Sequence, residues 1–140
     1  MNIIKLRPII TAEEKNTFVS EIQEAFQISY VSEFGKSEKK VLPTEDIEES
    51  FNTKGAEAYI AEIGGERIGG TVIVIDDKTG YNSLHLLYVK SSAQNAGNGF
   101  KIWKAIEELH PETRIWETHT PYYDKRNIHL GHSQILCKVQ

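Results

Sequence analysis

The feature that most constrains the fold of this chain is a run of three β-like segments between residues 56 and 89. Ala56–Ile63, Ile68–Ile75 and Tyr81–Val89 combine a period of two with β-branched and aromatic residues. Gly64-Gly65 separates the first two segments and is typical of a hairpin turn, and Asp76–Gly80 is a second turn. Because connections this short join antiparallel neighbours, the sequence predicts an antiparallel meander.

Helices are predicted before this meander. A first strand is predicted over about Ile3–Arg7, and Thr11 with Glu14 has the spacing of a capping box at a helix start. Apolar residues then recur at helical spacing to about Tyr30. They are Phe18, Ile22, Ala25 and Phe26. Pro43–Asp46 predicts the start of a second helix, with acidic residues at its positive end.

After the meander, a helix and further short elements are predicted. The helix has Ile102, Trp103, Ile106 and Leu109 on one side and ends at His110-Pro111. Arg114–Thr120 reads as a strand, Lys125–His132 as a short helix and Ile135–Val139 as a short strand. The order predicts an α+β fold in one domain, residues 1–140, with a βαβ-like crossover after the meander and flanking helices.

Composition excludes several classes of function. The net charge of -4 argues against general binding of nucleic acids or anionic membranes, which needs a basic face. Cys137 is the one cysteine, so no intrachain disulfide is possible, and we expect a small buried residue rather than a nucleophile. No apolar run approaches membrane-spanning length, and we expect a cytoplasmic protein.

The segment Leu87–Gly99 carries the clearest chemical signal. It runs from an apolar strand through a loop with closely spaced glycines into a helix start. Unpaired N–H groups and the helix dipole make such a start a site for anions, and glycines let a phosphate approach. Glycines that serve only a tight turn are the alternative. The fingerprints of dinucleotide-binding folds and of phosphate loops are both absent.

The hexapeptide Gln94–Gly99 resembles the pyrophosphate motif of the GNAT superfamily of N-acetyltransferases, Gln/Arg-x-x-Gly-x-Gly/Ala. The preceding strand end, Leu-x-Val, and the order of elements from Ile3 to Asn127 are also similar. The resemblance implies a mixed GNAT-like sheet and acetyl-CoA as co-substrate. It implies that backbone amides hold the coenzyme A pyrophosphate, and these belong to Gln94, Asn95, Ala96, Gly97, Asn98 and Gly99. Main-chain groups of Leu87 and Val89 would bond the pantetheine arm like an added strand, and Asn127 would meet the pantetheine or its thioester end.

The chain departs from the family pattern at the catalytic groups. A glutamate on the third meander strand often serves the family as base, and the matching residue here is Ser83. His85, two residues on and predicted on the same strand face, is our substitute candidate, because its ordinary pKa suits a base. A half-exposed strand histidine without a role is the alternative. Glu117 and His119 on the next strand are further candidates of the same kind.

The family tyrosine that protonates the thiolate is also missing from its usual place after Asn127. Tyr122 and Tyr123, just upstream, are our candidates for that catalytic role. A metal site would need His119, His129 and His132 together, and no carboxylate or thiolate spacing supports it, so we expect no metal.

The C-terminal part is expected to be short or altered relative to the family, which adds two strands where Ser133–Gln140 remains. An open edge at Ile135–Cys137 would favour a homodimer.

Three functional hypotheses follow. The first is an N-acetyltransferase that moves an acetyl group from acetyl-CoA to a primary amine of a small molecule or peptide, by direct attack. Tyr30, Glu33 and Phe34 are the predicted acceptor-side residues. The second is a module that binds coenzyme A or acyl-CoA without transferase activity, and the third is an interaction domain without a ligand.

Overall fold

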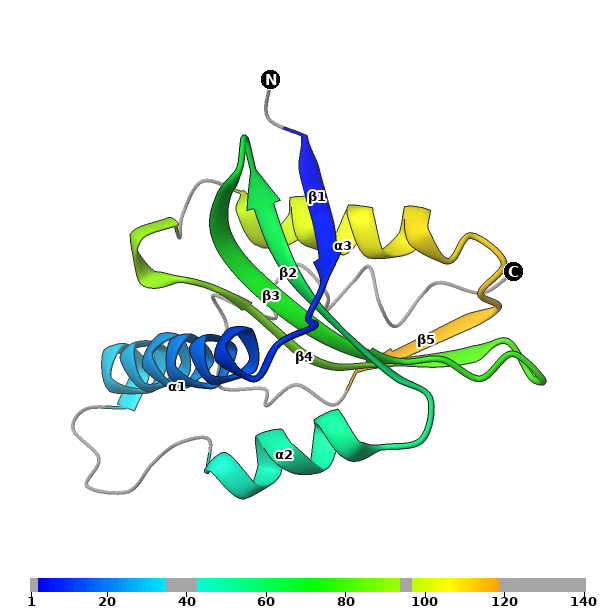
Figure 1. The fold of residues 1–140 in the computed structure, drawn as a ribbon, viewed down its shortest axis with the longest axis horizontal. Helices are drawn as coiled ribbons and strands as arrows, with labels where there is room; N and C mark the ends of the chain where they lie inside the picture. Colours follow the sequence, from blue (N-terminus) through cyan, green and yellow to red (C-terminus); the bar gives the residue numbers. More distant parts are fainter. Residues whose placement is uncertain (1–2, 35–42, 94–96, 119–140) are drawn as a thin grey trace.

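The computed structural model describes residues 3–34, 43–93 and 97–118. Within them, one sheet has the strand order β1-β2-β3-β4-β5 (Figure 1). The strands are β1 (Ile4–Pro8), β2 (Ala56–Ile63), β3 (Glu66–Val74), β4 (Tyr81–Val89) and β5 (Ile115–Thr118). The first four strands are antiparallel neighbours, and β5 runs parallel to β4. This confirms the predicted meander and the α+β class.

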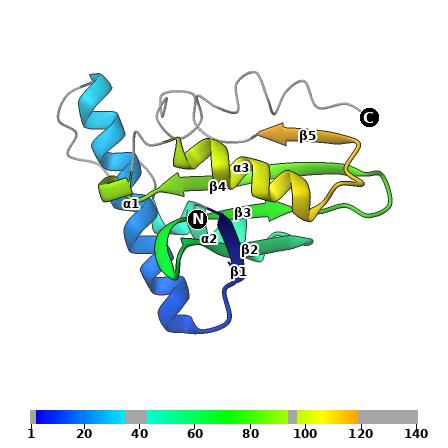
Figure 2. The same cartoon turned by 90° about the horizontal axis from the view of Figure 1, so that it is seen from above.

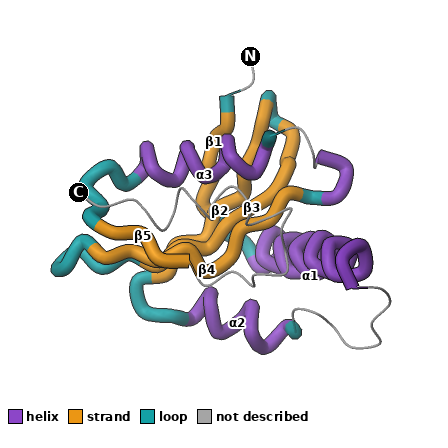
Figure 3. Tube along the Cα trace, turned by 180° about the vertical axis from the view of Figure 1, so that it is seen from behind, coloured by secondary structure: helices purple, strands orange, loops and turns teal. Residues whose placement is uncertain are grey.

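Helices cover both faces of the sheet. They are α1 (Ala12–Phe34), α2 (Thr44–Asn52) and α3 (Asn98–Leu109), with a short 3-10 turn, η1 (Ser91–Ala93), before α3. Helices α1 and α2 lie on one face and α3 on the other (Figures 1 and 3). The chain thus passes from β4 through α3 to a parallel β5, which confirms the predicted crossover.

The capping box at the start of α1 is confirmed. The Thr11 hydroxyl accepts the Glu14 N–H at 3.1 Å, and Oε1 of Glu14 accepts the N–H of Ile10 at 3.0 Å and of Thr11 at 3.3 Å. These bonds satisfy donors that a helix start leaves without intrahelical partners. The helix continues to Phe34, beyond the predicted end near Tyr30.

Two hydrophobic cores lie on opposite faces of the sheet. The core under α3 is formed by Ala61, Ile68, Ile73, Leu84, Leu87, Val89, Ile102, Trp103, Ile106 and Trp116. The core under α1 and α2 is formed by Phe18, Ile22, Ala25, Phe26, Ile47, Val72, Leu86 and Tyr88. Alternation along the strands sends successive side chains to one core and then to the other.

Several boundaries differ from the predicted ones. Strand β3 begins at Glu66 rather than Ile68, because the hairpin turn is confined to Gly64 and Gly65, both with positive φ. The predicted loop Ser91–Gly99 contains η1 and the first residues of α3. The elements predicted over 125–132 and 135–139, and with them Cys137, lie outside the described residues. None of the described helices is both long and apolar enough to span a membrane.

Candidate active site

The candidate site lies along the second half of β4, beyond its described pairing with β5. The two strands pair from Tyr81 with Ile115 to Leu84 with Thr118. Strand β4 then continues to Val89, past the last described residue of β5 (Figure 2). In the described part of the chain, the second half of β4 therefore has a strand partner on its β3 side alone.

The main-chain groups of Leu87 and Val89 point away from β3. Lys90 donates its backbone N–H to the carbonyl of Ile68 at 2.8 Å, so Lys90 faces β3. Along an antiparallel strand every second residue bonds to the same neighbour. Tyr88 thus faces β3 as well, and the peptide groups of Leu87 and Val89 face away from it. This is the orientation that an added strand or an amide-bearing ligand needs.

A register shift in β4 occurs next to Leu84, the last residue of its described pairing with β5. Val72 pairs with Leu86 and Ile73 pairs with Leu84, which leaves His85 as an extra residue on β4. A bulge of this kind changes which face later side chains occupy. Leu84 accordingly packs under α3, whereas Leu86 packs under α1 and α2. The prediction that His85 shares a face with Ser83 assumed a period of two along β4. The bulge interrupts this period at His85, which is half-buried.

The start of α3 lies beyond the end of β4. Gly97 is its N-cap residue with φ 72°, a left-handed conformation that favours glycine. The Lys101 N–H donates to the Gly97 carbonyl at 3.1 Å, so the N–H groups of Asn98, Gly99 and Phe100 belong to the first turn. The Asn98 side chain donates to the Ala93 carbonyl at 2.9 Å and ties the helix start to η1.

Gly97 is favoured by its backbone angle. A Cβ built on this residue would meet no atom of the described residues within 4 Å, so the glycine is required by this angle and not by crowding. Donors of the first helical turn and the helix dipole together suit an anion such as a pyrophosphate. The other three residues of the predicted cradle, Gln94, Asn95 and Ala96, lie outside the described residues.

Two glycines of β3 hold β4 close, and their role was not predicted from the sequence. A Cβ on Gly69 would lie 2.2 Å from the Tyr88 carbonyl oxygen, and one on Gly70 would lie 2.7 Å from the Phe18 ring. Both contacts are too short for any other residue without a shift. The adjacent Gly-Gly pair in an apolar strand was the available signal, since glycine in a strand marks a close approach.

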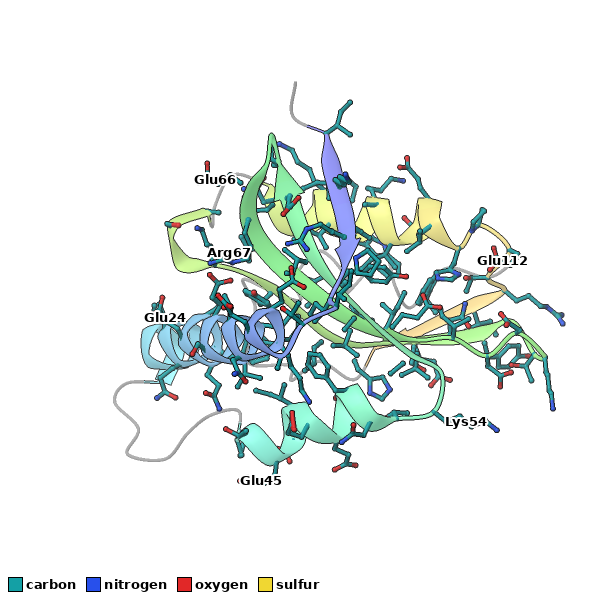
Figure 4. All side chains as sticks on the ribbon, viewed as in Figure 1. Glu24, Glu45, Lys54, Glu66, Arg67 and Glu112 are labelled. Atoms are coloured by element: carbon teal, nitrogen blue, oxygen red, sulfur yellow. The ribbon has the colours of Figure 1, made fainter. Side chains whose placement is uncertain are left out.

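A partly buried polar cluster joins α1 to β3 and to the same half of β4. The Tyr88 hydroxyl donates to Glu21 Oε1 at 2.7 Å, and Arg67 donates to both Glu21 oxygens, with Nη2 at 2.7 Å. Figure 4 labels Arg67, whose side chain points toward α1. Burial alone would raise the pKa of Glu21, but the bonds from Arg67 and Tyr88 outweigh it and lower that pKa. Burial and Glu21 raise the pKa of Tyr88, which stays a protonated donor.

The remaining predicted site residues are placed as follows. Tyr30, Glu33 and Phe34 lie in the last turns of α1, where the structure describes the backbone alone. Ser83 pairs with Glu117 across β4 and β5. The predicted residues His119, Tyr122, Tyr123, Asn127, His129 and His132 lie outside the described residues. Among the described residues, no three histidine, cysteine or acidic side chains are grouped as metal ligands would be.

Known proteins are similar to this chain in sequence or in fold. Residues 19–131 match the acetyltransferase (GNAT) family. The uncharacterised protein YrkN of Bacillus subtilis is 43% identical over 114 residues, which are 81% of this chain and 62% of YrkN. The crystal structure of YycN from Bacillus subtilis superposes with a TM-score of 0.67 at 12% identity, covering 91% of this chain and 87% of YycN. The PaiA N-acetyltransferase from Thermoplasma acidophilum, solved with coenzyme A, superposes with a TM-score of 0.54 at 18% identity. The match covers 78% of this chain and 72% of PaiA. The chain belongs to the GNAT family of acetyltransferases.

Proposed function

We propose that this chain is an acetyl-CoA-dependent N-acetyltransferase that acts on a primary amine of a small molecule or peptide. The observation that carries the proposal is the orientation of the Leu87 and Val89 peptide groups, which face away from β3 on the part of β4 between Leu84 and the start of α3. Outward-facing peptide groups and a helix N-terminus suit an elongated ligand with amides along its length and phosphates at one end. Acetyl-CoA has this chemistry, and the PaiA relative was solved with coenzyme A.

Each part of the site has a role in this proposal. Peptide groups of Leu87 and Val89 bond the pantetheine amides, and the backbone from Gln94 to Gly99 binds the pyrophosphate. Asn127 meets the thioester end. The acetyl group then lies near the last described β4–β5 pair, Leu84 with Thr118, with His85 beside it on the bulge. Tyr122 or Tyr123 protonates the departing thiolate, and Tyr30, Glu33 and Phe34 contribute to the acceptor pocket.

Calorimetric titration tests the cofactor site directly. We expect saturable binding of acetyl-CoA and of desulfo-coenzyme A and much weaker binding of ADP, because ADP lacks the pantetheine arm. Turnover is then followed by release of free thiol with a panel of primary amines. Binding without turnover for any amine would favour the alternative, a coenzyme A-binding module. Absence of binding by a folded chain would contradict both.

Two substitutions at Gly97 separate charge from backbone strain. Gly97→Gln and Gly97→Glu place side chains of the same shape in the same left-handed conformation, and no atom of the described residues lies within 4 Å of a Cβ there. The glutamate adds a negative charge beside the bound phosphates, so we expect it to weaken acetyl-CoA binding at least ~10-fold more than glutamine does. Circular dichroism and thermal unfolding check that both variants remain folded. Equal affinities of the two variants would contradict a phosphate site at Gly97.

A further inference from the structure

Strand β5 presents a carboxylate on the face opposite α3. The Trp116 side chain is 1% exposed and packs in the α3 core, with its ring centroid 5.2 Å from that of Trp103. Successive strand residues point to opposite faces, so the Glu117 side chain belongs to the α1/α2 face. Glu117 is exposed.

The parallel register places Glu117 beside Ser83. The two residues are Cα partners, and neighbouring strands lie ~4.8 Å apart. Leu84 packs in the α3 core, so Ser83 faces the same side as Glu117. A serine hydroxyl is not a base at neutral pH, whereas an ionised carboxylate on the adjacent strand can accept a proton from an amine. Strand β4 carries a serine at position 83, and its register partner on β5 provides the acidic group.

Glu117 also lies next to the end of the described β4–β5 pairing. The last β4–β5 pair is Leu84 with Thr118, one residue beyond Ser83 and Glu117. A ligand with its phosphates at α3 and its arm along Val89 and Leu87 has its other end directed toward this pair. Its reacting carbonyl therefore approaches Glu117. Among the residues that the structure describes, no ion pair or hydrogen bond involves the Glu117 carboxylate.

On the proposed function, we infer that Glu117 binds the acceptor as an ammonium ion and acts as the general base. Primary aliphatic amines have a pKa of about 10, so they reach the site protonated and attract a carboxylate. One proton passes from the ammonium to Glu117. The amine nitrogen then forms a bond to the thioester carbonyl carbon, and the carbon–sulfur bond breaks with its electron pair on sulfur. The thiolate takes a proton from Tyr122 or Tyr123, the second proton from nitrogen restores that tyrosine, and Glu117 returns its proton to solvent. The products are the N-acetylated amine, coenzyme A and one proton.

Three variants of the full chain test this role. Glu117→Gln removes the charge and keeps the shape, and Glu117→Gln combined with Ser83→Glu moves the carboxylate to its register partner. Glu108→Gln, an exposed residue of α3, is the control. Acceptors are n-hexylamine, a blocked lysine and hydroxylamine, which is largely neutral at pH 7. Acetyl-CoA affinity is measured by calorimetry for every variant.

We expect Glu117→Gln to lower kcat at least ~100-fold with the two aliphatic amines and far less with hydroxylamine, which needs no deprotonation. Acetyl-CoA affinity and the Glu108→Gln control should stay unchanged, and the double variant should regain at least ~10-fold of the lost rate. If wild type is active and Glu117→Gln is equally fast, the inference is wrong. An equal loss with hydroxylamine also overturns it, since that result indicates a structural role. If the wild type binds acetyl-CoA but acetylates none of these acceptors, the proposed function is wrong. This inference is then wrong as well.

Discussion

At the scale of single residues, Glu14 connects more elements than a capping residue usually does. One of its oxygens accepts the N–H groups of Ile10 and Thr11, and the other bonds Arg7 on β1, which also bonds Glu62 on β2 at 3.1 Å. The bond from the Ile10 N–H, followed by that from Arg7, lowers the Glu14 pKa from 4.5 to about 2. The carboxylate therefore ties the start of α1 to the edge of the sheet in its charged form.

This shift predicts a pH-dependent stability. A carboxylate with a lowered pKa in the folded state stabilises fully above its unfolded pKa and loses that contribution as pH falls through the folded value. We expect Glu14→Gln to lower the melting temperature at pH 7, and the difference from wild type to shrink as pH falls from 4.5 toward about 2. Thermal unfolding at a series of pH values measures this. Glu13→Gln, on the exposed neighbour, is the control. A difference independent of pH would show that the Glu14 charge is not the stabilising group.

At the scale of elements, the close pairing of β3 and β4 fixes the strand that we assign to the pantetheine arm. Gly69 lies opposite Val89, and Gly70 lies opposite Tyr88. Neither glycine has a positive φ, so the limit at these positions is space and not backbone angle. The bond from the Thr71 hydroxyl to the Leu86 carbonyl, 2.7 Å long and buried, strengthens the same pairing.

Gly69→Ala should therefore separate the two strands. Its methyl group would lie 2.2 Å from the Tyr88 carbonyl oxygen, which is backbone and cannot turn aside. We expect a loss of about 2–3 kcal/mol in the free energy of unfolding, measured in urea, together with weaker acetyl-CoA binding. Gly64→Ala in the β2–β3 turn, where φ is positive and no atom lies within 4 Å, measures backbone strain without a clash for comparison. Unchanged stability of Gly69→Ala would contradict the packing argument.

Local signals in the sequence were sufficient for most elements. The period of two over Ala56–Ile63, the Gly64-Gly65 turn and the Thr11–Glu14 box each depend on residues that are neighbours along the chain, and all are confirmed. The glycine loop before α3 was recognisable for the same reason.

The parts that were not predictable depend on pairing between distant segments. The bulge at His85 and the partnership of Ser83 with Glu117 are properties of two strands, and no pattern within either strand specifies them. The Glu21–Tyr88 bond joins residues 67 positions apart. For that reason the sequence could name Glu117 as a candidate base but could not bring it next to Ser83.

At the scale of the whole molecule, the two hydrophobic cores should respond independently to mutation. Ile22 belongs to the core under α1 and α2, and Ile106 belongs to the core under α3. Each Ile→Val change is expected to cost about 0.5–1.5 kcal/mol, and the double variant should equal the sum within ~0.5 kcal/mol. Ile102 and Ile106, both in the α3 core, form the comparison pair and should deviate from additivity. Urea unfolding of the single and double variants measures both cycles. Coupling between Ile22 and Ile106 as large as that within the α3 core would contradict independent cores.

The sheet between these cores separates two groups of residues that have different roles. On the proposed function, the coenzyme is held by the β4 backbone and the start of α3, whereas the amine is met by side chains on the α1/α2 face. A descendant that acquires a new acceptor needs replacements on that second face, and the half that holds the coenzyme can be inherited unchanged. Acceptor specificity can thereby change in evolution while the coenzyme-binding part, β4 and the start of α3, stays the same.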